Sequence, residues 1–287
     1  MSVALAKPYS PRLLNKEYTV WSVQAKLDGV RAIWREGQLF TRTGKIIHAP
    51  DWFYERMEDV LGNDLTVDGE LIHEDQVFNS KDSTHLFQDV VSTVRKKVPK
   101  DEEWRSISFC AFDAHTSLAY RERLLLIESL LLLSPDGDTM ASHCRKVISV
   151  PILGYIRIQD DESRVRKVDE FLQESLDKGF EGIMLRDINS PWSEKRTDRL
   201  LKVKPVEDDE ATVIAIQEGE GKYKGMIGAL VCESKGMRFK VGTGLTDEER
   251  SHGAGYWIDR YITYRFTERT RAGMPRHPAF VCIRDYD

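Results

Sequence analysis

The chain has 287 residues and a mass of 33.1 kDa, enough for two domains with separate hydrophobic cores. With 41% hydrophobic and 31% charged residues, its composition excludes a disordered or fibrous protein. The four cysteines form no C-x-x-C pair, so neither a zinc module nor a disulfide framework is predicted. Despite the net charge of -5, basic residues cluster at 199–204 and 260–276, which predicts a basic face on an acidic body.

The longest apolar stretch, residues 124–133, is interrupted by Glu128 and is shorter than the roughly 20 residues of a membrane span. We interpret it as a buried helix. The N-terminal residues lack the charged start and long apolar region of a signal peptide. We therefore expect a cytoplasmic protein that does not bind membranes.

Hydrophobic periodicity predicts alternating strands and helices up to residue 206. Alternation of apolar and polar residues predicts strands at 20–26, 31–35, 65–72, 108–113, 182–186 and 200–204. Helical periodicity is found at 52–61, 121–133 and 163–178, and Gly179 is placed to end the last helix as a C-cap. This order predicts an α/β first domain.

Four adjacent acids at 207–210 resist packing, so we expect a hinge there, between a first domain of residues 1–206 and a second of residues 207–287. The second domain is rich in predicted strands, at 211–217, 228–233, 238–241, 260–266 and 279–283. A capping box from Thr246 to Glu249 predicts one short helix. These elements fit an oligonucleotide-binding β-barrel.

The hexapeptide from Lys26 to Arg31, K-L-D-G-V-R, brings an amine, a carboxylate and a guanidinium close together directly after a predicted strand. A lysine becomes a nucleophile when burial or a neighbouring cation favours its neutral form, and Arg31 could supply that cation or bind a phosphate. The alternative is a solvated hairpin turn, because Asp-Gly is common in such turns. The hexapeptide alone leaves both interpretations open.

Five further segments follow in order: L-F-T-R-T at 39–43, V-D-G-E-L at 67–71, F-C-A-F-D at 109–113, E-G-I-M-L-R at 181–186 and L-K-V-K-P at 201–205. Each alone could be a hairpin, a sheet core or the exposed side of a strand. In this order after K-x-D-G-x-R, they resemble the motifs of ATP-dependent DNA ligases and messenger-RNA capping enzymes, in which the lysine bonds covalently to a nucleoside monophosphate. The ending at 274–284 resembles the last motif of small viral and phage DNA ligases.

The resemblance implies an α+β fold. A nucleotidyltransferase domain, with ATP-grasp-like antiparallel sheets and helices, would precede a C-terminal OB-fold β-barrel. The chain looks like a minimal two-domain ligase of viral or phage type, which would act in the host cytoplasm if a phage encodes it. The turn at 218–225 is too short for the DNA-clasping hairpin of some small viral ligases.

The resemblance also implies the site. Lys26 would be the catalytic nucleophile toward ATP, Glu70 would bind the ribose and Phe112 would stack on the base. The remaining nucleotide-binding candidates are Gln24, Arg31, Glu181, Lys202, Lys204 and Arg284. The DNA-binding candidates are Asp28, Arg31, Arg42, Arg196 and Arg276, and the candidates for holding Mg2+, with Mn2+ as a substitute, are Asp28 and Glu181. The expected partner is nicked double-stranded DNA, bound by a monomer.

Three other functions are considered. A capping guanylyltransferase shares the lysine chemistry, but the R-H-P-x-F ending and the absence of a triphosphatase domain argue against it. RNA ligases usually lack this barrel. A non-catalytic module that binds nicks or single strands is the alternative from another class, and the retained Lys26, Glu70 and Glu181 argue against it.

Overall fold

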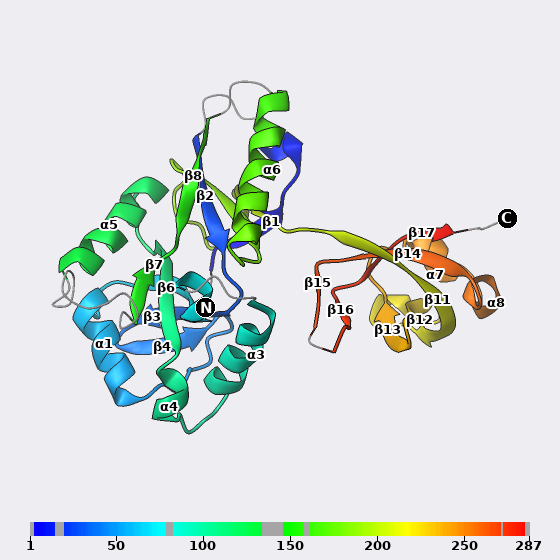
Figure 1. Cartoon of the computed structure of the whole chain (residues 1–287), viewed down its shortest axis with the longest axis horizontal. Helices are drawn as coiled ribbons and strands as arrows, with labels where there is room; N and C mark the ends of the chain where they lie inside the picture. Colours follow the sequence, from blue (N-terminus) through cyan, green and yellow to red (C-terminus); the bar gives the residue numbers. More distant parts are fainter. Residues whose placement is uncertain are drawn as a thin grey trace. The chain divides into compact units, whose positions relative to one another are not determined.

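The computed structural model describes residues 3–14, 20–78, 83–133, 146–157, 161–270 and 272–284. The chain divides into two compact units, Met1–Lys204 and Pro205–Asp287 (Figure 1). Each unit has its own hydrophobic core and is described by itself.

The first unit contains two five-stranded sheets. One, the Lys26 sheet, has the strand order β1-β10-β9-β2-β8. Its strands are β1 (Leu5–Pro8), β10 (Arg196–Val203), β9 (Gly182–Asp187), β2 (Val20–Lys26) and β8 (Ile152–Arg157). Trp21 and Val23 of β2 are fully buried in its core, whereas Gln24 and Lys26 are two residues apart and share one face of the strand.

The other sheet of this unit, the Glu70 sheet, has the order β4-β3-β5-β6-β7. Its strands are β4 (Gln38–Thr41), β3 (Val30–Arg35), β5 (Val67–His73), β6 (Ile107–Ala114) and β7 (Val147–Ser149). Asp68 pairs with Asp113 and Gly69 pairs with Ala111, so Phe112 is the extra residue of a β-bulge in β6.

Helices cover both sheets of the first unit (Figure 1). The helices α3 (Ser83–Val94) and α5 (Tyr120–Leu133) contact the Glu70 sheet, α1 (Asp51–Leu61) packs on α5 and β7, and α6 (Asp161–Asp177) packs on β8 and β9. Shorter helices are η1 (Pro11–Leu14), α2 (Asp75–Phe78) and α4 (Asp101–Trp104). Gly179 follows α6 with a φ of 79°, which confirms its predicted role in ending that helix.

The segment after Lys26 connects the two sheets. Because β2 and β3 belong to different sheets, the alternative that Asp28-Gly29 forms a hairpin turn is wrong. A Cβ atom at Gly29 would lie 2.3 Å from the carbonyl oxygen of Leu71 in β5. Glycine is therefore required where this segment passes against the Glu70 sheet.

The second unit is built on a sheet of order β13-β12-β11-β14-β17. Its strands are β11 (Glu207–Glu218), β12 (Ile227–Ser234), β13 (Met237–Val241), β14 (Tyr261–Phe266) and β17 (Ala279–Arg284). A parallel bridge joins Thr243 to Ala279, but no further pairing among the described residues closes this sheet into a barrel. The unit also contains η3 (Gly221–Tyr223), α7 (Asp247–Ser251), α8 (Ala254–Trp257), β15 (Glu268–Arg269) and β16 (Pro275–Arg276).

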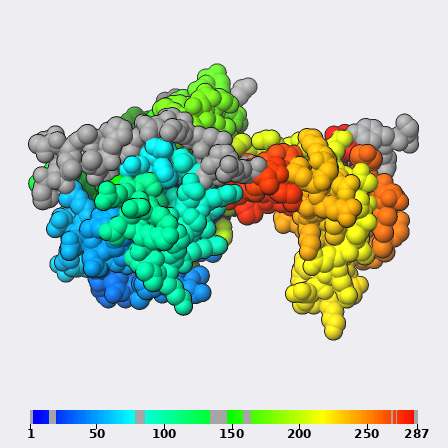
Figure 2. Space-filling model, turned by 60° about the horizontal axis from the view of Figure 1, so that its bottom comes forward, coloured from blue at the N-terminus to red at the C-terminus, as the bar shows by residue number. Residues whose placement is uncertain are grey.

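The predicted capping box is confirmed. The Thr246 side chain accepts from the Glu249 backbone, and Glu249 accepts from the Thr246 backbone at the start of α7. The turn between β11 and β12 is short, with Gly219 donating to the Met226 carbonyl. Figure 2 shows the yellow segment of this unit, which includes β11 and the turn, projecting from its surface.

Two expectations are wrong. The acidic run at 207–210 does not resist packing: it is the start of β11, where Asp209 accepts hydrogen bonds from Lys235 and Arg269 and Glu210 lies 3.3 Å from Arg284. Cations on neighbouring segments therefore allow the acids to enter a sheet. Secondly, α5 is buried along one face only: Leu124 is buried, whereas Leu125, Leu132 and Leu133 are 63%, 72% and 82% exposed.

Candidate active site

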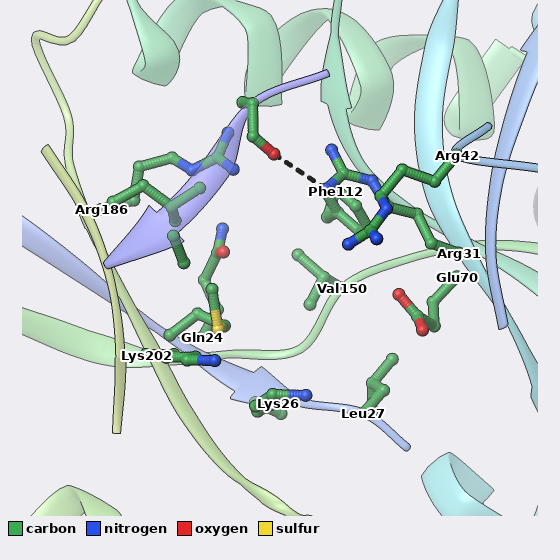
Figure 3. A pocket seen from close by; sticks show the side chains of 15 residues that line it. Gln24, Lys26, Leu27, Arg31, Arg42, Glu70, Phe112, Val150, Arg186 and Lys202 are labelled. Atoms are coloured by element: carbon green, nitrogen blue, oxygen red, sulfur yellow. Dashed lines mark hydrogen bonds between the residues drawn. The ribbon is translucent and has the colours of Figure 1, made fainter. Parts of the chain in front are cut away.

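A pocket of ≈ 290 Å³ lies between the two sheets of the first unit (Figure 3). Seven of the predicted site residues line it, namely Gln24, Lys26, Arg31, Arg42, Glu70, Phe112 and Lys202. The Lys26 sheet provides the amine and Lys202, whereas the Glu70 sheet provides a carboxylate and an aromatic ring. The packing of the two sheets thus brings together residues up to 178 positions apart.

Glu181 connects the two motifs that contain Lys26 and Lys204. Its carboxylate forms ion pairs with both ammonium groups. Its backbone N–H donates to the Lys26 carbonyl at 2.9 Å, and Gly182 follows with a φ of 152°. A Cβ at Gly182 would lie 2.3 Å from the Val203 carbonyl oxygen, so the glycine allows β9 to approach β10 beside Lys204.

Lys202 lies in β10 and Lys204 directly follows that strand, with the buried Val203 between them. Partial burial lowers the pKa of Lys202, and the charges of Lys26 and Arg196 lower it further. Lys26, Lys202, Arg31 and Arg42 nonetheless give the pocket a lining rich in cationic side chains. Such a surface favours a polyphosphate ligand.

Arg31 is held by protein groups. Its Nε donates to Asp68 Oδ1 at 2.8 Å, its Nη2 donates to Asp68 Oδ2, and its Nη1 donates to the Ala4 carbonyl at 2.8 Å. Its guanidinium carbon lies 5.4 Å from the centre of the Phe112 ring. Arg42, in contrast, is exposed and has no hydrogen bond or ion pair with the described residues, so its guanidinium is the better placed to bind a phosphate.

Glu70 lies opposite Arg31 on the neighbouring strand. Burial raises its pKa to about 7, although the charges of Lys26 and Arg31 oppose the shift. This carboxylate is therefore poised between its two protonation states near neutral pH.

Four predicted positions of the first unit do not line the pocket, namely Glu181 and Lys204, described above, and Asp28 and Arg196. Asp28 is 5% exposed, and the side-chain amide of Gln76 binds its backbone N–H and carbonyl. Arg196 is exposed at the start of β10, where its guanidinium donates to the Ala6 carbonyl. The described residues contain no cluster of three or more acids, histidines or cysteines that could hold a metal ion.

The remaining two predicted residues belong to the second unit. Arg284, in β17, donates from Nε to Thr263 Oγ1 at 2.9 Å and lies 3.3 Å from Glu210. Arg276, in β16, is opposite Glu268 in a two-stranded sheet. Both lie in the segment whose sequence resembles the last ligase motif.

Sequence reasoning missed a buried polar cluster beside the pocket, one member of which, Arg186, lines it. Asp113 binds both Arg123 and Arg186, and these two guanidinium groups lie over the ring of Tyr120. The Tyr120 hydroxyl accepts from Gln24 and donates to the Phe112 carbonyl at 3.1 Å. Asp113 and Arg186 end two of the recognised motifs, which was the available signal, whereas Tyr120 belongs to none of them.

The comparisons with known proteins agree in both units. Residues 3–204 match the family model of the ATP dependent DNA ligase domain, and residues 218–284 match that of the DNA ligase OB-like domain. A DNA ligase of Haemophilus influenzae is 28% identical over 267 residues, which cover 93% of this chain and 87% of that protein. A DNA ligase of Methanosphaerula palustris is 29% identical, but the match covers only 44% of its length.

Solved structures give the same result. A structure from work on Lig E DNA ligases and DNA binding with a minimal scaffold is 30% identical, with a TM-score of 0.77 and coverage of 99% of both chains. The Chlorella virus DNA ligase-adenylate, 22% identical with a TM-score of 0.53 over 100% and 99% of the two chains, supports the fold alone. No helix among the described residues is long and apolar enough to cross a membrane. Since its family match covers residues 3–204, this chain belongs to the ATP-dependent DNA ligase family.

Proposed function

We propose that this enzyme seals nicks with a 3'-hydroxyl and a 5'-phosphate in duplex DNA through AMP bound covalently to Lys26. Members of the family form phosphodiester bonds in nicked DNA using ATP and a divalent metal. The proposal rests on one observation: Lys26 lines a pocket that also offers a carboxylate, an aromatic ring and a second lysine. These groups suit a ribose, a base and phosphates respectively.

In the first step the neutral amine of Lys26 attacks the α-phosphorus of ATP. A nitrogen–phosphorus bond forms, the bond to the β-phosphate oxygen breaks, and pyrophosphate leaves. Lys202 and Lys204 offset the charge that develops on the oxygens, together with Arg284 or Arg276 of the second unit. Glu181 orients both Lys26 and Lys204, because its carboxylate is paired with each of them.

In the second step AMP moves to the 5'-phosphate at the nick, and in the third the 3'-hydroxyl attacks and AMP departs. Arg42 is our candidate for binding the 5'-phosphate, with Arg196 as a further DNA contact. Since Arg31 is paired with Asp68, we assign it mainly to the pocket wall beside Phe112. Phe112 would stack on adenine and Glu70 would accept from a ribose hydroxyl.

Mg2+, with Mn2+ as a substitute, fits this site through substrate phosphates and one carboxylate. Mg2+ usually keeps several waters and uses only one or two protein carboxylates beside phosphates. Neither Glu181 nor Asp28 lines the pocket, but the Glu181 carboxylate is paired with Lys26, which does, so we assign the ion to Glu181. The ion would supply Lewis-acid stabilisation of charge on phosphate oxygens.

We assign adenylation to residues 1–206 and closure over ATP and DNA to the OB-like residues 207–287, in an enzyme that acts as a monomer. The separate cores of the two units support this division. Without a long clasping hairpin at 218–225, DNA affinity would rest on phosphate contacts.

Labelled nucleotides test the proposal. With ATP and a divalent metal, the protein should form an acid-labile, alkali-stable adduct of enzyme and AMP, whereas GTP and NAD should form none. Lys26→Ala should abolish this adduct, whereas Lys178→Ala, at an exposed position directly after α6, should retain it. An adduct that survives Lys26→Ala, or that forms mainly with GTP, would refute the assignment.

A further inference from the structure

Tyr120, the first residue of α5, connects Gln24 to the bulge in β6. Its hydroxyl donates to the Phe112 carbonyl at 3.1 Å. Phe112 is the extra residue of the bulge, and such a residue is left out of the strand pairing. A hydroxyl has one proton, so a Tyr120 that donates to Phe112 can only accept from Gln24.

The ring that carries this hydroxyl contacts two charged groups. The guanidinium carbons of Arg186 and Arg123 lie 4.4 Å and 5.3 Å from its centre, and both arginines are paired with Asp113. Burial raises the pKa of Tyr120 to about 12, so the hydroxyl keeps its proton at neutral pH. Because the Phe112 carbonyl can only accept, this proton points to Phe112 and the hydroxyl oxygen accepts from Gln24.

The amide of Gln24 is oriented by this hydroxyl. Gln24 is 3% exposed, and Figure 3 shows it among the side chains that line the pocket. Its Nε2 donates to Tyr120, whereas its Oε1 accepts no hydrogen bond from the residues that the structure describes. An oxygen, and not a nitrogen, is thus the group that this side chain offers to a ligand.

We propose that Tyr120 is a positioning residue that sets the preference for ATP over nucleotides with a 6-oxo purine by fixing the orientation of the Gln24 amide. This inference rests on the proposed function. The Gln24 oxygen can accept a hydrogen bond from the 6-amino group of adenine. A 6-oxo purine has an oxygen at that position, so two acceptors would face each other with no proton to share. An amide that is free to turn would present Nε2 instead and would accept either base. A glutamate at this position would need no such control, because both of its oxygens accept.

Single-turnover adduct formation with ATP and with inosine triphosphate tests the inference. The wild-type protein, Tyr120→Phe, Gln24→Glu and the double variant are compared over a range of nucleotide concentrations. Tyr120→Phe should lower the preference for ATP over inosine triphosphate by about tenfold, because the two orientations of the Gln24 amide become close in energy. The change should appear mainly in the nucleotide concentration that gives half-maximal adduct formation, and less in the maximal rate. Combining Gln24→Glu with Tyr120→Phe should restore the preference.

Tyr54→Phe is the matched control. The Tyr54 hydroxyl is also bound to backbone groups, at Ile47 and Ala49, but Tyr54 does not line the pocket, so its loss should leave the preference unchanged. Equal losses with both nucleotides in Tyr120→Phe, or no rescue in the double variant, would overturn the inference. A wild-type protein that forms no adduct with ATP would instead contradict the proposed function.

Discussion

Two carboxylates in the first unit each bind two cations, but in different surroundings. Glu181 is paired with Lys26 and Lys204, whose side chains are 21% and 20% exposed. Asp113 is paired with Arg123 and Arg186, whose side chains are 1% and 5% exposed. Arginine keeps its charge and holds a carboxylate in a rigid fork, whereas lysine can lose its proton and act as a nucleophile. One carboxylate paired with two cations is thus a fixed support in the core at Asp113, whereas at Glu181 the same arrangement holds the reactive Lys26.

The largest effect should come from the buried cluster. Asp113→Asn should lower the free energy of unfolding by about 3–5 kcal/mol, because it leaves two buried guanidinium groups without a counter-charge. Urea denaturation measures this loss. Glu103→Gln, which breaks a partly exposed ion pair with Lys96, is the control and should change stability little. Similar losses in the two variants would mean that the Asp113 cluster has no special structural role.

The opposite profile is expected for Glu181, the carboxylate paired with Lys26. Glu181→Gln should reduce the rate of adduct formation by about a hundredfold, because the proposed orientation of Lys26 and the metal contact are lost. Its denaturation midpoint should stay close to that of the wild type, since its partners remain in contact with water. If Glu181→Gln lowered stability but left the rate of adduct formation per folded molecule unchanged, the distinction between the two clusters would be removed.

Exposed arginines should separate the chemical steps. Arg284→Ala should slow sealing of an ordinary nick with ATP by roughly tenfold or more, yet seal a pre-adenylated nick almost normally, because its proposed role lies in the first step. Arg42→Ala should form the adduct normally and seal both substrates poorly. Single-turnover assays on the two substrates measure this contrast. Equal losses on both substrates for Arg284→Ala would remove its assignment to the first step.

Glu70 should give the smallest effect. Its pKa is about 7 in the folded protein and 4.5 ordinarily, so between these values the folded state binds more protons and stability falls as pH rises. The full shift corresponds to about 3 kcal/mol, and residual contact with water should reduce it to about 1 kcal/mol. Glu70→Gln should therefore gain about that much stability over the wild type between about pH 5 and about pH 8 in urea titrations. A constant difference across this range would show that Glu70 does not titrate there.

Much of the fold was predictable, because strong local patterns were not overridden by packing. The predicted strand at 20–26 coincides with β2, and the expected α+β nucleotidyltransferase fold with an OB-like second domain is confirmed. The short β7 and β8 and the helix α3 were not predicted. The acidic start of β11 was misinterpreted because the cations that stabilise it are distant in the sequence.

The site was predictable only as far as its motifs. Lys26, Glu70 and Phe112 belong to recognised segments, and the structure brings them to one pocket, although their catalytic roles stay predictions. The sequence could not predict that Arg31 binds Asp68, because this contact depends on the pairing of β3 with β5. Tyr120 was missed because its position follows from how α5 docks onto β6, which no local pattern encodes.

The passage of the chain at Gly29 from one sheet to the other has a consequence for experiments on folding. Lys26 lies on one sheet and Glu70 on the other, so neither sheet alone contains a complete site. The ability to become labelled by ATP should therefore return only when both halves of the first unit have assembled. Adduct formation would therefore report the assembly of the two sheets during refolding. Recovery of β-sheet structure alone would not report it, because either half could form its strands by itself.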